Sequence, residues 1–334
     1  MADFTHLHLH TAYSFLDGAI HVADLVPRLA ELGMDACAVT DHGNLFGAID
    51  FYRQAKKAGI KPIIGAELYV AEDMHEKSPQ PNRHLLALAQ NQTRYRKLMY
   101  LVSQGHLQGF YRRPRVDKKL LAERSEGLIA TTACLGGEVP QACKNGDMDA
   151  ARASALELKQ IFEPGKLFLE IQENDRPEQK LANDGLKQLA RDLELPLVAT
   201  NDCHYMMREA ADAHDVLMAI GYQKQRSDPT RYRRGSDAFY VRAVEEMKGL
   251  FRDCPEAIDN TRRITEMVEL ELELGKPHLP TFVTPDGSDL VTHLTERAYR
   301  GLDERFTEMS YAVDRDMYRA RLQRELDIII SMKF

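Results

Sequence analysis

The chain has 334 residues, of which 44% are hydrophobic and 28% charged, and its formal net charge is −7 at pH 7. This composition is ordinary for a globular protein, and the negative net charge excludes DNA binding through a uniformly basic surface. The longest apolar runs are too short to cross a bilayer and the first residues lack a signal-peptide layout, so we expect a cytoplasmic protein without a membrane partner.

Three histidines alternate with leucines near the start of the chain, in residues 5–10. Side chains alternate between the two faces of a strand, so His6, His8 and His10 are expected to share one face. Three imidazoles followed by Asp17 favour a divalent ion of the zinc or manganese type over a catalytic triad. A single buried histidine is more often a hydrogen-bonded core residue, so the prediction depends on ligands from other segments.

Strand and helix patterns alternate along most of the chain. The apolar patterns predict strands at residues 5–10, 36–40, 61–70, 85–89, 127–132, 166–171 and 197–199. Helical periodicity predicts helices at residues 22–32, 45–58, 95–105, 148–162 and 179–193. The initial β-α-β-α-β order is typical of parallel strands joined by crossover helices. Seven strands with helices between most of them predict an α/β fold, a distorted TIM-like (β/α) barrel with its chemistry at the C-terminal strand ends.

The regular alternation fades after about residue 212. Residues 277–288 are rich in Pro, Gly and Thr and predict a linker. A last predicted helix, at residues 315–330, runs into an apolar end at Phe334, so we expect the chain to be cut from a longer one. We therefore expect a first domain at residues 1–275 and a separate region at residues 276–334.

Most metal-competent side chains fall at or near the ends of the predicted strands. The candidate metal ligands are His8, His10, Asp17, His42, Glu67, His84, Cys134, Asp202 and His204. One zinc ion takes about four ligands, so this set can hold two or three divalent ions, with Glu67 or Asp202 as a bridge. We expect Zn or Mn, with Mg or Fe as alternatives. Adjacent ions of this kind favour hydrolysis of a phosphoester, and we expect catalytic roles for all of these residues except His84 and Cys134.

Neighbouring polar residues receive other predictions. His6 lies deeper in its strand and is expected to contact a ligand instead of the metal. Asp41 is expected to face away from the ions and to orient a ligand or cap the next helix. Cys203 alternates to the opposite face and is expected in the core, and Asp314 is expected at a helix start.

Two clusters of basic residues occur in segments predicted as loops. Their arginines include Arg112, Arg113 and Arg115 in one segment, and Arg231, Arg233 and Arg234 in the other. The simple interpretation is a solvated loop. Because aromatic residues are interleaved with these arginines, the functional interpretation is a groove for single-stranded nucleic acid, in which arginines follow phosphates and rings stack on bases.

Six motifs resemble one known family. They are HLHLHTAYSFLDG, TDHGNLFGAIDFY, KPIIGAELYV, NRHLLALAQN, ACLGGEVP and LVATNDCHY. They resemble the PHP (polymerase and histidinol phosphatase) domain of bacterial DNA polymerase III alpha subunits, and later segments resemble the stretch that leads to the palm of that enzyme. The resemblance implies a distorted seven-stranded barrel and a three-metal site built from the nine candidate ligands. The polymerase aspartates of the family lie in the palm, beyond Phe334, so this chain is not expected to polymerise DNA.

Three functions are consistent with these observations. The first is a metal-dependent 3′–5′ exonuclease acting on single-stranded or primer-template DNA. Its partners would be the remaining domains of the polymerase, a separate proofreading subunit and the sliding clamp. The second is a structural or interaction module in which metals brace the barrel without catalysis. The resemblance implies a scaffold role for relatives in which the ligands are replaced. The third, a small-molecule phosphatase such as histidinol phosphatase, is disfavoured by the polymerase-like C-terminal segments and the basic aromatic loops.

Overall fold

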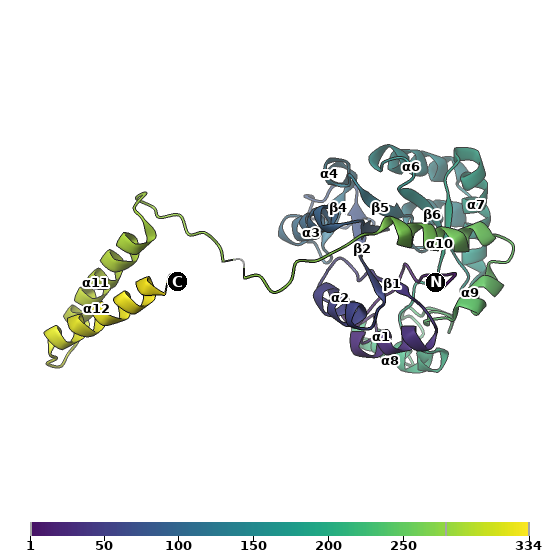
Figure 1. The fold of residues 1–334 in the computed structure, drawn as a ribbon. Helices are drawn as coiled ribbons and strands as arrows, with labels where there is room; N and C mark the ends of the chain where they lie inside the picture. Colours follow the sequence, from purple (N-terminus) through teal and green to yellow (C-terminus); the bar gives the residue numbers. More distant parts are fainter. Residues whose placement is uncertain (1, 278, 333–334) are drawn as a thin grey trace. The chain divides into compact units, whose positions relative to one another are not determined.

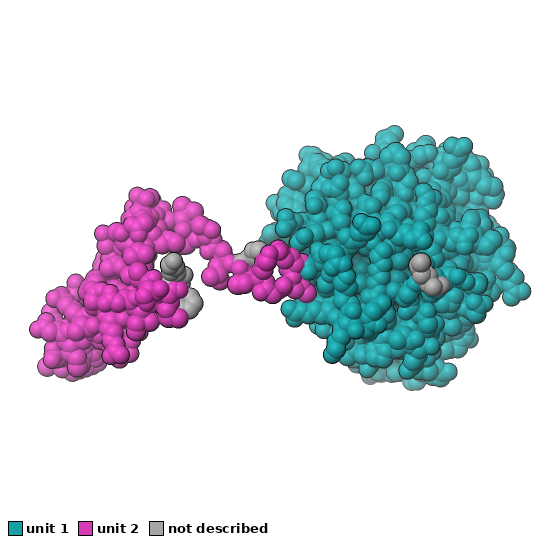
Figure 2. All heavy atoms as spheres, viewed as in Figure 1, with its two compact units in different colours: residues 1–272 teal, residues 273–334 magenta. Residues whose placement is uncertain are grey.

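A computed structural model describes residues 2–277 and 279–332 of the chain. The chain divides into two compact units, Met1–Leu272 and Glu273–Phe334 (Figure 2). The division lies three residues before the boundary expected from the sequence. The candidate ligands all belong to the first unit.

The first unit is built on one seven-stranded sheet that curls into a half-barrel (Figure 1). Its strands are β1 (Ala36–Val39), β2 (Lys61–Ala71), β3 (Arg83–Ala89), β4 (Arg115–Asp117), β5 (Leu128–Thr131), β6 (Leu167–Gln172) and β7 (Leu197–Thr200). Their order is β1-β2-β3-β5-β6-β7, and β4 pairs with β2. The predicted fold, a distorted seven-stranded α/β barrel, is confirmed.

Strand direction differs from the expected parallel arrangement at β3. This strand is antiparallel to both β2 and β5, whereas β1–β2, β2–β4, β5–β6 and β6–β7 are parallel. The physical reason is that no helix lies between β2 and β3, and a parallel neighbour needs a crossover connection. The reversal brings the start of β3 to the end of β2, where His84 lies opposite Tyr69.

The histidine-rich segment at residues 5–10 is not a regular strand. It forms single bridges, from His6 to Cys37 on one side and from Leu9 to Cys203 on the other. The Ala38 amide donates to the His6 carbonyl (2.8 Å), and the His10 amide donates to the Cys203 carbonyl (2.8 Å). The segment thus lies between β1 and the chain that follows β7, while β4, in a predicted loop, is the seventh strand.

Helices surround the strands (Figure 1). They are α1 (Val22–Glu31), α2 (Ala48–Lys57), α3 (Gln92–Leu107), α4 (Lys118–Arg124), α5 (Glu138–Lys144), α6 (Met148–Ile161), α7 (Pro177–Leu193), α8 (Ala211–Gly221), α9 (Val244–Leu250) and α10 (Pro255–Met267), with a short 3₁₀ turn at Arg208–Ala210. Side-chain caps fix several starts, as where Asn91 accepts from the Arg94 amide and Asp147 from the Ala150 amide. The five helices predicted in this unit are present, although α2 begins three residues later than predicted because residues 46–47 form a turn.

The core fixes the strands that carry the candidate ligands. The leucines of the histidine-rich segment, Leu7 and Leu9, are fully buried in the same apolar cluster as Phe168, Leu186 and Val198. Complete burial of one such side chain contributes roughly 1.5–3 kcal/mol to folding. The alternating pattern of this segment therefore does two things, since its leucines anchor the backbone and its histidines are held on the other side.

The second unit contains two helices, α11 (Leu290–Glu308) and α12 (Arg315–Ser331), which contact each other. Asp314 caps α12 by accepting from the Asp316 and Met317 amides, as its predicted place at a helix start requires. In this unit Phe306 and Leu326 are buried. Phe334, at the apolar end predicted for the last helix, lies outside the described residues. None of the described helices is both long and apolar enough to span a membrane.

Candidate metal centre

The side chains predicted as metal ligands lie together at one rim of the sheet. Three groups of ligand atoms each lie within 4.8 Å of one another: His8, His10 and Glu67; His10, His42 and His204; and His42, Glu67 and His84. The remaining three candidates contact members of these groups. Asp17 Oδ2 is 2.9 Å from His42 Nε2, Asp202 Oδ1 is 3.1 Å from His8 Nε2, and Cys134 Sγ is 3.5 Å from His84 Nδ1. All nine side chains form one connected cluster.

Glu67, in the middle of β2, is the centre of this cluster. Its Oε1 is 2.9 Å from His84 Nδ1 and 3.3 Å from His8 Nε2, and its Oε2 is 2.6 Å from His42 Nδ1. Cys134 Sγ lies 3.6 Å from Oε1. The Glu67 carboxylate is buried, so it faces four metal-competent side chains without competition from solvent.

Three histidines are oriented through the nitrogen that faces away from the centre. Nδ1 of His8 lies 2.7 Å from Glu170 Oε1, and Nδ1 of His10 lies 3.0 Å from Ser14 Oγ. Nδ1 of His204 lies 2.7 Å from the backbone carbonyl of Asp202. Each of these contacts can accept a proton from Nδ1 and directs Nε2 to the centre, which is the usual arrangement of metal-binding histidines.

Residues outside the cluster hold these orienting groups in place. Ser14 Oγ donates to Asp41 Oδ1 (2.7 Å), which also accepts from the Thr11 amide (2.7 Å). Asp41 thus orients His10 through Ser14, and it does not cap α2. The sequence analysis did not identify Glu170 as a site residue. A possible signal was its position, since it is an acidic residue within a buried strand, as Glu67 is.

Four ligand atoms of the cluster are buried and have no hydrogen-bond partner: His42 Nδ1, Glu67 Oε2, Asp202 Oδ1 and His204 Nε2. The first two are 2.6 Å apart, yet they are not aligned as a hydrogen bond. Buried polar groups in folded proteins are nearly always hydrogen bonded. Nitrogen and carboxylate lone pairs that converge without such bonds fit a set of ligands for divalent ions.

The local charges support the same interpretation. Burial alone would raise the pKa of Glu67, but His84, His42 and His8 hold that pKa well below its usual value. Burial would lower the pKa of His42, but Glu67 and Asp17 raise it to about 9. Burial, reinforced by Glu67, raises the pKa of the Cys134 thiol. The carboxylates are therefore ionised, whereas His42 and the Cys134 thiol keep their protons unless a cation replaces them.

Arg234 is part of this centre, although the sequence placed it in a DNA-binding loop. Its Nη2 lies 2.7 Å from Asp17 Oδ1, and its guanidinium lies over the Phe239 ring. Burial would raise the pKa of Asp17, but Arg234 and His204 hold it well below the usual value.

The other predicted DNA-contacting arginines fall into two groups. Arg115 is buried and donates to the carbonyls of Gly109 and Glu76, and Arg231 is buried and pairs with Asp215. These two side chains stabilise their own loops, which corrects the expectation that they are free to contact DNA. The exposed arginines of the predicted set are Arg112, Arg113 and Arg233.

Histidines beside the cluster have partners that the sequence did not indicate. His6 lies 3.0 Å from the Arg242 carbonyl and 3.5 Å from Cys203 Sγ, so both its nitrogens face away from the centre. Cys203 is buried in the core, as expected. His214 Nε2 donates to the Asp17 carbonyl (2.6 Å) and thereby fixes the loop that carries the Asp17 carboxylate.

Three non-glycine residues with positive φ lie in or next to the cluster: Leu16 (61°), Ala133 (58°) and Asp202 (49°). Leu16 precedes Asp17, Ala133 precedes Cys134, and Asp202 is itself a candidate ligand. Such backbone conformations cost on the order of 1–3 kcal/mol each and concentrate at functional sites. The surrounding fold therefore holds the backbone in strained positions where it presents these ligands.

Residues 6–174, about half of the chain, match the sequence profile of the PHP domain. The chain belongs to the PHP domain family. Its whole length is similar to DNA polymerase III subunit alpha of several bacteria, with 39% identity to the Campylobacter jejuni protein over 366 aligned residues, which cover 100% of this chain and 30% of that protein. Identity is 40% to the Borreliella burgdorferi protein (99% and 29% covered) and 40% to the Thermus aquaticus protein (91% and 26% covered). This PHP chain thus spans about 30% of the length of these relatives.

Two solved structures cover most of this PHP chain. One is a protein from Bifidobacterium adolescentis assigned by prediction as a metal-dependent phosphoesterase, with a TM-score of 0.40 and 14% identity over 73% of this chain and 95% of the other. The second is a two-domain protein from Bacteroides vulgatus containing a predicted PHP-like metal-dependent phosphoesterase, with a TM-score of 0.38 and 15% identity over 78% and 63%.

Proposed function

We propose that this PHP region hydrolyses phosphodiesters at the 3′ ends of DNA as part of a replicative polymerase alpha subunit. The observation that carries the proposal is the convergence of buried His42 Nδ1, Glu67 Oε2, Asp202 Oδ1 and His204 Nε2 without hydrogen bonds. Similarity to DNA polymerase III alpha subunits over the whole chain supports DNA as the substrate.

We propose that the nine candidate ligands hold two or three divalent ions, Zn or Mn, with Mg or Fe as alternatives. Such ions, when bound, lower the pKa of water and neutralise charge on a phosphate. The protein supplies the orientation. Glu170 and Ser14 fix the rings of His8 and His10, and Glu67 lies within reach of three histidines.

In the proposed hydrolysis, the oxygen of a water molecule forms a bond to phosphorus, the bond from phosphorus to the ester oxygen breaks, and a proton reaches that leaving oxygen. The ionised Asp17 lines the cavity and is placed to accept a proton from the attacking water and pass it to that oxygen, while His42, 2.9 Å away, holds its Oδ2. Arg234 pairs with Asp17 and keeps its carboxylate ionised and in position.

The direct test uses a 5′-labelled primer-template with a mismatched 3′ end, together with protein loaded with Zn or Mn. Asp17→Asn and His42→Ala should each lower the rate of 3′ trimming at least about 100-fold, because loss of even a group that orients a metal ligand costs 10- to 100-fold. Asp73→Asn, a change at an exposed carboxylate away from the cluster, should leave the rate unchanged. Metal-loaded wild-type protein that trims neither single-stranded nor primer-template DNA would refute the proposed activity.

A metal-braced structural role is a second candidate. The ligands come from positions as distant in sequence as His8 and His204, so bound ions would cross-link the two ends of the sheet. In that case chelation would lower the melting temperature although no hydrolysis was lost. Hydrolysis of histidinol phosphate in preference to DNA would instead indicate the small-molecule phosphatase.

The partners are proposed from similarity to the longer relatives. They are the remaining domains of the alpha subunit, a separate proofreading subunit and the sliding clamp, in the cytoplasm. Co-purification of these proteins with the full-length subunit, and loss of binding when residues 1–272 are deleted, would assign any of them to this region.

A further inference from the structure

A second cavity, of about 310 Å³, adjoins the metal centre. Asp17, His42 and Tyr69 line both this cavity and the one that contains the candidate ligands. A ligand whose phosphate lies at the metal centre can therefore extend into the second cavity without leaving the protein surface. This volume is at the small end of the range for ligand pockets, so it suits one nucleotide rather than a longer segment.

The wall of this cavity is a row of aromatic side chains. The ring of Phe15 is 5.9 Å from that of Phe46, which is 6.3 Å from His106, which is 6.3 Å from Phe110. Phe15, Phe46 and Phe110 are 66%, 57% and 52% exposed. Large apolar rings that gather at a surface in this way mark a binding site, and aromatic faces are the usual platform for unpaired bases.

Charge at the cavity selects the kind of ligand. Arg112 and Arg113 are exposed and line it, and Arg113 also lines the metal centre and lies over the Tyr69 ring. His106 Nε2 donates to the Gly43 carbonyl (3.0 Å), which fixes one ring of the row. Cations beside stacked rings favour an anionic chain that carries flat bases, as single-stranded nucleic acid does.

We propose that this cavity binds the base of an unpaired nucleotide next to the scissile phosphate, by stacking on Phe46 and its neighbours. The inference rests on the proposed function and defines its substrate more narrowly. A paired terminal base is stacked and hydrogen bonded within the duplex, so it must be unpaired before it can enter the cavity. The site therefore selects single-stranded or frayed 3′ ends over paired ends.

Binding is tested apart from hydrolysis. The probe is a fluorescently labelled oligo(dT) with phosphorothioate linkages at its 3′ end, and its dissociation constant is measured by anisotropy with the full 334-residue chain loaded with Mn. Phe46→Ala should weaken binding about 5- to 150-fold, because stacking of one base contributes about 1–3 kcal/mol. Phe46→Trp, which keeps a stacking face, should restore it. The matched control is Phe282→Ala, since Phe282 in the second unit is also 57% exposed and lies 5.7 Å from a histidine ring.

Hydrolysis separates this inference from the proposed function. The specificity constant kcat/KM is compared for oligo(dT) and for bis(p-nitrophenyl) phosphate, which has no base. Phe46→Ala should lower kcat/KM for oligo(dT) relative to kcat/KM for bis(p-nitrophenyl) phosphate, mainly by raising KM for the oligonucleotide. Equal binding of oligo(dT) by wild-type protein and Phe46→Ala would show that this cavity is not a base site. The same result is expected if the aromatic row binds a protein. Failure of wild-type protein to hydrolyse either ester would refute the proposed function, while the binding comparison would still decide the base site.

Discussion

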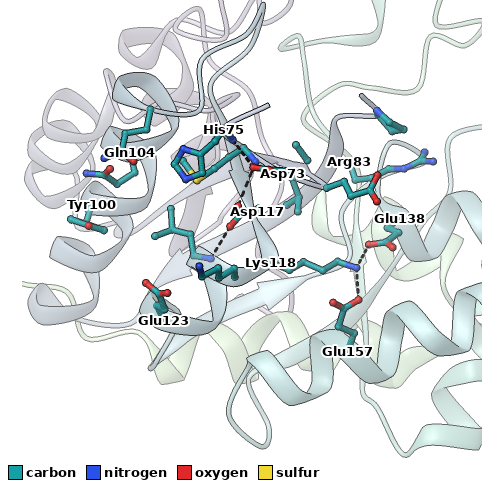
Figure 3. A pocket seen from close by; sticks show the side chains of 18 residues that line it. Asp73, His75, Arg83, Tyr100, Gln104, Asp117, Lys118, Glu123, Glu138 and Glu157 are labelled. Carbon is teal, nitrogen blue, oxygen red and sulfur yellow. Dashed lines mark hydrogen bonds and ion pairs between the residues drawn. The ribbon is translucent and has the colours of Figure 1, made fainter. Parts of the chain in front are cut away.

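The clearest contrast in the described part of the molecule is between the metal centre and a third cavity, the largest of the three and called the largest cavity below. The largest cavity has a volume of about 960 Å³, and most of the side chains that line it are charged or polar (Figure 3). Three of its charged side chains form ion pairs, since Lys118 Nζ lies 2.7 Å from Glu138 Oε2 and 2.6 Å from Glu157 Oε2, and Asp117 caps α4 by accepting from the Leu120 amide. The cavity at the metal centre is smaller, about 370 Å³.

The smaller cavity contains the unpaired atoms. Among the described residues, eleven have a buried side-chain nitrogen or oxygen without a partner, and eight of these line the metal centre: His42, Glu67, Asn82, Gln172, Asn174, Asp202, His204 and Arg234. None of the eleven lines the largest cavity. A buried polar group without a hydrogen bond lowers the stability of the folded protein. Eight residues with such groups around one cavity therefore indicate that this cavity binds a ligand. Size alone would have selected the wrong cavity.

The largest expected effect comes from a neutral substitution at the centre of the cluster. Glu67→Gln removes the carboxylate that faces three histidines and should lower metal affinity at least about 100-fold, since loss of even an outer contact of a metal ligand costs 10- to 100-fold. Competition with a chromophoric chelator measures that affinity. Glu138→Gln in the largest cavity is the control and should bind metal as the wild type does. Equal metal affinities of Glu67→Gln and Glu138→Gln would show that the two cavities do not differ in metal binding.

Metal addition should stabilise the first unit. At a free ion concentration 1,000 times the dissociation constant, a site present only in the folded state adds about 4 kcal/mol to the free energy of unfolding. For a unit of this size that corresponds to a rise in melting temperature of roughly 10 °C, measured by calorimetry on chelator-treated protein before and after Zn or Mn is added. In Glu67→Gln, with an affinity at least about 100-fold lower, the same ion concentration should give at most about a third of this rise. An equal rise in that variant would mean that the ion binds elsewhere.

Acid should destabilise the metal-free protein through His6. Burial lowers the pKa of this side chain to about 4 in the folded state, below the usual 6.5. The unfolded chain takes up the proton first as pH falls, so stability is complete above pH 6.5 and is lost towards pH 4, by roughly 3 kcal/mol in total.

The measurement for His6 is urea unfolding across this pH range. His6→Gln should flatten the loss of stability below pH 6.5, whereas His75→Gln, a change at an exposed histidine of the largest cavity, should follow the wild type. Parallel curves for His6→Gln and wild type would contradict this account, because they would mean that the pKa of this imidazole is the same in the folded and unfolded protein.

The smallest effect is expected in the largest cavity. Lys118→Met breaks the pairs with Glu138 and Glu157, which are partly exposed, so the free energy of unfolding should change by less than about 1 kcal/mol. Metal content and 3′ trimming should not change. Loss of either property would show that the paired charges of this cavity serve the metal centre after all.

The sequence was sufficient to predict the fold class and the convergence of the candidate ligands. Alternation and strand ends determine where His8, Glu67 and Asp202 lie, and both are local properties of the chain. The regular strand at residues 5–10 was not found, because that segment bridges two neighbours at single residues and pairs fully with neither.

Other features depend on contacts between distant residues. Glu170 is distinguished from an ordinary strand residue only by its 2.7 Å contact with His8, which is 162 positions away. In the sequence, Arg234 is one of several basic residues in a predicted loop. It belongs to the metal centre only because the fold brings Asp17 within 2.7 Å of its guanidinium. The reversal of β3, by contrast, could have been predicted, since no helix is predicted between residues 70 and 85 and a parallel neighbour needs a crossover connection.

Anomalous X-ray scattering at the zinc and manganese absorption edges, from crystals grown without a chelator, tests the central claim most directly. We expect two or three peaks among His8, His10, Asp17, His42, Glu67, His84, Cys134, Asp202 and His204, and none in the largest cavity. Crystals soaked in either metal that show no peak within bonding distance of these side chains would contradict the account.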